Sequence, residues 1–199
     1  PGSTVRADGY FTSIRVQGSL NATGVVFTSA SGGEPGSWGG LAFSPGSQGT
    51  LDNVTVRFGG GETNGLVDMD EALVTIRNSR FEDGSGDGLW IRNSSPTIAA
   101  CSFARNGGAG IRLLGTCYPS FSGDLGPAGQ GIWVNATTLT HSGTWEYAGI
   151  PYVLNGDVTV PDSVRFELEP RVVVKANSYF HSFLVHGTLR AAASAGDSV

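Results

Sequence analysis

The sequence predicts an all-β fold, a single-stranded parallel β-helix (solenoid) whose coils contain about 22–25 residues each. Three observations lead to this prediction: a short phrase that returns once per coil, a second set of apolar positions with the same spacing, and a lack of helical periodicity. The 31 glycines would interrupt any long run with a spacing of 3.6 residues.

The repeated phrase is a glycine, an aliphatic residue, any residue, and usually another apolar residue. Its glycines are 25, 23, 22 and 21 residues apart. They are Gly40, Gly65, Gly88, Gly110 and Gly131. Each copy has the length of one short strand, which cannot bury its apolar side alone. Successive coils are therefore expected to stack and share a core.

Two further apolar series have the same spacing and are followed by polar or glycine-rich corners. They are Leu51, Ile76 and Ile98, and Val56, Phe81 and Phe103. This pattern indicates two or three strands per coil. At about 4.8 Å per coil, about eight coils would form a rod roughly 40 Å long.

The sequence at the beginning of the chain is repeated near its end. Residues 1–22 align without a gap on residues 170–191, and ten of the 22 positions are identical. We therefore expect β-helix coils in residues 1–137, a bridging segment in 138–160, and the start of a second repeat unit in 161–199, all in one continuous solenoid. Both ends should show the same phase of the coil. Open strand edges at such ends predict head-to-tail self-association or continuation in a longer array.

Charge and hydropathy argue against two classes of partner. The chain has 12 basic and 17 acidic residues, for a net charge of −5, so nucleic acid is not an expected partner. It has no run of 18 apolar residues, so insertion into a membrane is not expected.

Two phrases carry a family resemblance: PGSWGGLAF at residues 35–43 and LDNVTV at residues 51–56. They resemble secreted bacterial proteins with right-handed parallel β-helix repeats, of the pectate-lyase-like solenoid superfamily. The resemblance implies a right-handed coil and a secreted or cell-surface location. It covers most of the chain.

The enzyme motifs of that superfamily are absent. The chain lacks the Arg-x-Pro-x-x-Arg phrase of pectate-lyase-like enzymes and the Gly-His-Gly and Arg-Ile-Lys phrases of polygalacturonase-like enzymes. We therefore expect a non-enzymatic structural unit of a stalk, adhesin or filament, without a required cofactor. The alternative is a β-helix that binds or degrades polysaccharide.

The nearest feature to a ligand site is a predicted outward column. The residue two positions after each glycine should point away from the core. These residues are Ala42, Val67, Trp90, Arg112 and Trp133. Trp90, Arg112 and Trp133 would form a cation–π stack, flanked by Arg92 and Asn135. Three interpretations are open: a cover formed by residues 138–150 with Trp145 and Tyr147, a self-supporting ladder, or a surface that binds a glycan or another partner.

Acidic residues gather at two neighbouring places, Asp68, Asp70 and Glu71, and then Asp83 and Asp87. They could hold Ca²⁺, supply the acid and base for glycoside cleavage, or be solvated turns. Asp68 stands where other copies have an inward apolar residue, and we expect a β-bulge that brings Met69 inward instead.

Cys101 and Cys117 are the two cysteines, 16 residues apart. A disulfide between neighbouring coils is one interpretation. Aligning Phe121 with Phe103 leaves Cys117 two positions out of register, although the loop near Pro119 could restore it. The other interpretation is that Cys101 is a core thiol beside Ser79 and Val54.

Overall fold

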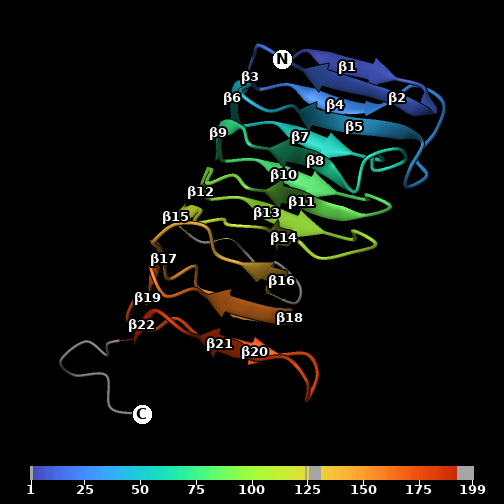
Figure 1. Ribbon diagram of the computed structural model, residues 1–199. Coiled ribbons are helices and arrows are strands. Elements are labelled where there is room, and N and C mark those ends of the chain that lie inside the picture. The colour runs from blue at the N-terminus through green and yellow to red at the C-terminus, as the bar shows by residue number, and fades with distance from the viewer. Residues whose placement is uncertain (1, 124, 126–130, 192–199) are drawn as a thin grey trace.

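The computed structural model describes residues 2–123, 125 and 131–191, which form a stack of parallel coils with no helix among them. Figure 1 shows the coils following one another from β1 at one end of the rod to β20, β21 and β22 at the other. All strand pairs in this part of the chain are parallel, and the rod has about eight turns of about 23 residues. The predicted right-handed parallel β-helix is confirmed.

The strands form four sheets that run along the rod. Sheet A contains β1 (Thr4–Ala7), β4 (Val26–Ser29), β7 (Thr55–Arg57), β10 (Arg80–Glu82) and β13 (Ser102–Ala104). Sheet B contains β2 (Gly9–Val16), β5 (Trp38–Phe43), β8 (Gly65–Asp70), β11 (Asp87–Arg92), β14 (Ile111–Leu114), β16 (Ile132–Thr138), β18 (Tyr152–Val160), β20 (Val174–Ala176) and β21 (Phe183–Val185).

Sheet C contains β3 (Ser19–Thr23), β6 (Gln48–Asp52), β9 (Leu73–Arg77), β12 (Thr97–Ala99) and β15 (Ser120–Ser122). Sheet D contains β17 (Gly143–Trp145), β19 (Arg165–Leu168) and β22 (Thr188–Ala191). The first five coils each pass through sheets A, B and C in turn.

The core consists of apolar columns that run through the coils. Leu51, Ile76 and Ile98 are in register in sheet C, as predicted. The predicted series in sheet A is also in register, and its two phenylalanines, Phe81 and Phe103, stack with ring centroids 5.5 Å apart. Each coil therefore buries its inward side chains against the coils above and below, as a solenoid requires.

One corner of the coil repeats the same backbone conformation. Directly after each strand of sheet C, one residue lies in the left-handed region, with φ between 49° and 72°. These residues are Gly24, Asn53, Asn78, Ala100 and Gly123. Glycine and asparagine adopt this conformation at the lowest cost. The sharp corner turns the chain from one sheet to the next while the backbone ladder continues.

The structure corrects the third copy of the glycine phrase. Leu41 and Leu89, the second residues of their copies, both pair with Val67. The copy between them therefore begins at Leu66 and not at Gly65. Val67 and Met69 both point into the core, and Asp68 takes the outward position between them. The prediction that Met69 lies inward is correct. No bulge produces it, because the register between β8 and β11 is unbroken from Gly65 to Asp70.

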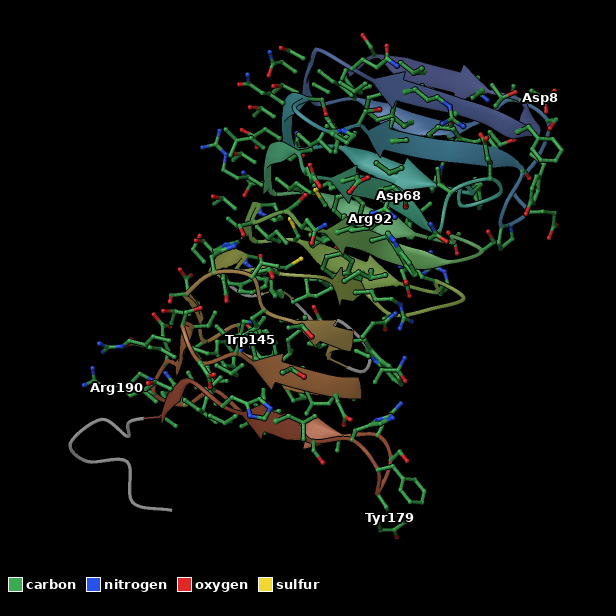
Figure 2. The ribbon with its side chains drawn as sticks, in the orientation of Figure 1. Asp8, Asp68, Arg92, Trp145, Tyr179 and Arg190 are labelled. Carbon is green, nitrogen blue, oxygen red and sulfur yellow. The ribbon has the colours of Figure 1, made fainter. Side chains whose placement is uncertain are left out.

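Residues 138–160 lie inside the stack, where we expected a segment that fits no coil. β17 pairs with β19, and β18 pairs with β16 on one side and with β20 and β21 on the other. Trp145 is buried and stacks on Tyr152 with ring centroids 4.5 Å apart. Figure 2 shows Trp145 within the coils near the C-terminal end. This segment therefore continues the core.

The two copies of the repeated sequence, residues 1–22 and 170–191, begin on different sheets. Val5 lies in β1 of sheet A, whereas its counterpart Val174 lies in β20 of sheet B. The second strands agree, since β2 and β21 both belong to sheet B, whereas the third strands, β3 and β22, again lie on different sheets. The expectation that both ends show the same phase of the coil therefore holds for the second strand and is wrong for the first and third.

Candidate functional site

The candidate site is the outer face of sheet B, where one column of side chains runs along the rod. The register places Asp68, Trp90, Arg112, Trp133, Val153 and Lys175 on successive strands. Asp68 replaces Val67 in the predicted column. In Figure 2, Asp68 and Arg92 lie on the neighbouring strands β8 and β11 of this sheet.

Arg112 lies between two indole rings, and the predicted cation–π stack is present. Its guanidinium carbon is 5.6 Å from the ring centroid of Trp90 and 5.5 Å from that of Trp133. Both tryptophans remain partly exposed. Such contacts each contribute about 0.5–2 kcal/mol.

A carboxylate and an amide hold Arg112 in this position. Its Nε donates to Asp87 Oδ2 at 2.6 Å and its Nη2 donates to Asp87 Oδ1 at 3.1 Å. Its Nη1 donates to Asn135 Oδ1 at 3.2 Å. Asn135 in turn accepts from Asn155, and Asn155 accepts from Asn177, so the amides form a ladder across three strands. The hydrogen bonds with Asp87 and Asn135, together with the two indole rings, therefore hold the guanidinium in place.

The predicted cover over this column is not formed by Trp145 or Tyr147. Trp145 lies in the core, and Tyr147 packs against Arg171 with its ring centroid 4.1 Å from the guanidinium carbon. Within the described residues, the geometry of Trp90, Arg112 and Trp133 matches the self-supporting ladder.

The five carboxylates do not converge on one point. Asp70 pairs with Arg92, Asp83 with Arg105, and Asp87 with Arg112. Glu71 occupies a corner with φ of 46°. In the part of the chain that the structure describes, no three His, Cys, Asp or Glu side chains approach closely enough to hold one ion. Of the three open interpretations, the one in which these five residues share a calcium ion lacks such a cluster of ligands among the described residues.

Asp68 differs from the other carboxylates because backbone amides surround it. Its oxygens accept hydrogen bonds from the backbone N–H groups of Asn64 and Gly65, at 3.1 and 2.9 Å. Burial raises the pKa of Asp68 to about 6, and the nearby charge of Asp87 adds to the rise, while the N–H donors oppose it. Asp68 therefore changes its charge near neutral pH.

The pairing of arginines with acids one coil earlier was not predicted. Arg92 follows Asp70 by 22 residues, Arg105 follows Asp83 by 22, and Arg77 follows Asp52 by 25. Each spacing equals one coil, so the pairs could have been found by searching for opposite charges at the repeat distance. The acids were instead grouped by their proximity in sequence.

The cysteines are both free and buried, so the interpretation with a disulfide does not hold in this structure. Cys101 lies at the corner between β12 and β13, next to Ser79 in the coil before, whereas Cys117 lies at a different corner, between β14 and β15. Phe121 pairs with Ile98 and not with Phe103, which explains the error in the alignment. Burial raises the pKa of both thiols. The interpretation of Cys101 as a core thiol agrees with the structure.

Stacked parallel coils, a continuous apolar core and ion pairs from coil to coil define a β-solenoid repeat protein. The family described as "Right handed beta helix region" matches residues 7–140, about two thirds of the chain, and the chain belongs to this family. A search of curated proteins and a search of solved structures each returned no match. Among the described residues, no helix is long and apolar enough to cross a bilayer.

Proposed function

We propose that this chain is a non-enzymatic structural segment of an extracellular or cell-surface β-solenoid, such as a stalk, an adhesin or a filament. In this role its end coils receive further coils, and the rod grows along its axis. The resemblance to secreted bacterial β-helix proteins supports the location, and the core that runs through every described coil supports the mechanical role.

The observation that carries the proposal is the exposure of inward-facing side chains in the end coils. Val5 is in register with Phe27, which is buried, yet Val5 itself is 39% exposed. At the other end, Val185 is in register with the fully buried Val160 and is 43% exposed. These residues are apolar because each is in register with side chains that form the core of the neighbouring coils. A further coil would bury them and satisfy the free edges of their strands.

The outer surface supports a structural role rather than catalysis. Most of its acidic candidates are held by arginines of the next coil, and the motifs of the polysaccharide enzymes are missing. Coil-to-coil ion pairs add modestly to the stability of the stack. A carboxylate engaged in such a pair is poorly placed to transfer a proton to a substrate.

The test compares two adjacent residues of β21. Val185→Asp places a charge in the inward column, whereas Leu184→Asp changes its outward neighbour, which is also exposed. We expect the natural chain and Leu184→Asp to form longer rods as concentration rises, in sedimentation velocity and electron microscopy. Val185→Asp should remain monomeric, because stacking would bury the new carboxylate between two chains without a partner for its charge. A natural chain that stays monomeric at high concentration would contradict end-to-end stacking.

A second candidate function is binding of a sugar chain along the outer face of sheet B. The specific observation is that Trp90 and Trp133 are partly exposed beside a guanidinium and the row of amides that includes Asn135. Indole faces and planar donors of this kind suit sugar rings.

Affinity electrophoresis with neutral and acidic polysaccharides tests this second function. Retardation that is lost in Trp133→Ala, with the fold intact by circular dichroism, would support a binding surface. Shortening of the polysaccharide during the same incubation would overturn the non-enzymatic proposal.

A further inference from the structure

A pocket beside the last strands of sheet B brings together two basic side chains. It is lined by Tyr147, Ile150, Pro151, Arg171, Val173 and Lys175, and its volume is about 270 Å³. Lys175 is the single lysine in the sequence, and it is the last member of the outward column on sheet B. The pocket therefore lies on the outer surface, and part of its wall belongs to the last described coil.

The arginine of the pocket is held in place by its neighbours. The Arg171 guanidinium carbon lies 4.1 Å from the ring centroid of Tyr147, and Nη2 donates to the Tyr147 hydroxyl at 3.0 Å. Tyr147 is itself fixed, because its backbone N–H donates to Glu169 Oε2 at 2.8 Å. Arg171 thus uses one donor on the tyrosine and keeps several donors for another acceptor.

The backbone also fixes the apolar wall. Val173 accepts a hydrogen bond at its carbonyl oxygen from the N–H of Tyr152, at 2.9 Å. This bond places Val173 beside Pro151 on the neighbouring coil. Ile150, Pro151 and Val173 therefore form an apolar surface next to the two cations.

The charges in the pocket differ from those on the other strands of sheet B. Elsewhere on sheet B, Arg92 pairs with Asp70 and Arg112 pairs with Asp87. Arg171 and Lys175 form no ion pair with a carboxylate of the described residues. The neighbouring Glu169 is bonded to a backbone N–H. Two cations without an ion-pair partner in one pocket favour an anion as a ligand.

We propose that this pocket binds a small organic carboxylate. The carboxylate lies against the guanidinium of Arg171 and the ammonium of Lys175, and the apolar body of the ligand lies against Ile150, Pro151 and Val173. Arginine suits this role because its planar donors match the two oxygens of a carboxylate. The cavity volume limits the ligand to about the size of a single ring.

The probe is benzoate, with benzamide as the neutral analogue of the same shape. In an NMR titration or by calorimetry, we expect benzoate to saturate with a dissociation constant in the millimolar range, as is usual for a ligand with so few atoms. Benzamide should bind about tenfold more weakly, since it loses the charge-assisted contacts. Added salt should weaken the binding of benzoate and leave that of benzamide unchanged.

Two variants and a matched control locate the binding. Arg171→Gln and Lys175→Gln should each weaken benzoate by about tenfold. Arg80→Gln, which removes an exposed cation from β10 on sheet A, should have no effect. Equal affinity of benzoate for the natural chain and both pocket variants would overturn the proposal, as would the absence of saturation at millimolar benzoate.

The result is separable from the proposed structural role. Stacking uses the inward column and the free strand edges of the last coil, whereas Val185 does not line the pocket. Val185→Asp should therefore bind benzoate as the natural chain does, even where it no longer forms rods. Loss of stacking with intact binding would leave this inference standing, and the reverse outcome would leave the structural role standing.

Discussion

Replacing Arg112 by methionine should destabilise the rod strongly, because the change leaves a buried charge without its partner. The Arg112 and Asp87 side chains are only 17% and 4% exposed, and two hydrogen bonds join them. Removal of one partner from a buried ion pair costs about 3–5 kcal/mol. Loss of the contacts with Trp90 and Trp133 adds to this cost.

Arg92→Met is the matched control. Arg92 also forms two hydrogen bonds with a carboxylate one coil earlier, at 2.9 and 2.6 Å to Asp70. Here the side chains are 55% and 28% exposed, so water screens the pair. An exposed pair of this kind contributes at most about 1 kcal/mol. The two variants therefore differ in burial far more than in geometry.

The assay is thermal and urea unfolding followed by circular dichroism. For a chain of this length, about 1 kcal/mol shifts the melting temperature by roughly 2–4 °C. We expect Arg112→Met to lower the melting temperature by on the order of 10 °C and Arg92→Met by no more than about 4 °C. Adding Asp87→Asn to Arg112→Met should recover part of the loss, since it removes the stranded charge. Equal losses in the two single variants would refute the reasoning from burial.

Three further outcomes are expected. The pKa of Asp68 is raised to about 6, above the value near 3.9 of an unfolded chain. Its contribution to stability is therefore fully present below pH 4 and lost as pH rises through 6, by about 3 kcal/mol. In urea titrations Asp68→Asn should remove this dependence, and an unchanged pH profile would contradict it. Cys101 and Cys117 should resist a thiol reagent in the folded chain and react once it unfolds, and reductant should not alter the melting temperature; rapid labelling of the folded chain would refute their burial. Phe81→Ala should cost about 3–5 kcal/mol because its ring is buried against Phe103, whereas Leu73→Ala, at an exposed position, should cost little; similar unfolding free energies for both would disagree with the core described above.

The repeat distance alone determined the fold class. Apolar residues such as Leu51 and Ile76 stand one coil apart because each must meet its counterpart in the next coil, and this requirement is visible without coordinates. The stack of Trp90, Arg112 and Trp133 was predictable for the same reason, since strand alternation places all three on one face.

Differences in coil length limited how accurately the sequence predicted the register of individual residues. The coils differ in length, and a shift of one residue moves a side chain from the core to the surface. The glycine phrase aligned Gly65 with Gly40, but the strand pairing aligns Leu66 there, and this exchanged Val67 and Asp68. The same uncertainty placed Cys117 near Cys101 when the two lie at different corners.

Partners across coils were decided only by the tertiary structure. Asp68 and Asp70 are two residues apart and Asp87 follows on the next strand of sheet B, yet each is held by different groups: backbone amides for the first, Arg92 for the second and Arg112 for the third. The pocket of Arg171 and Lys175 likewise depends on Tyr147 from the coil before. A sequence shows which residues recur at the coil distance, whereas the register and the corner geometry decide which side chains then touch.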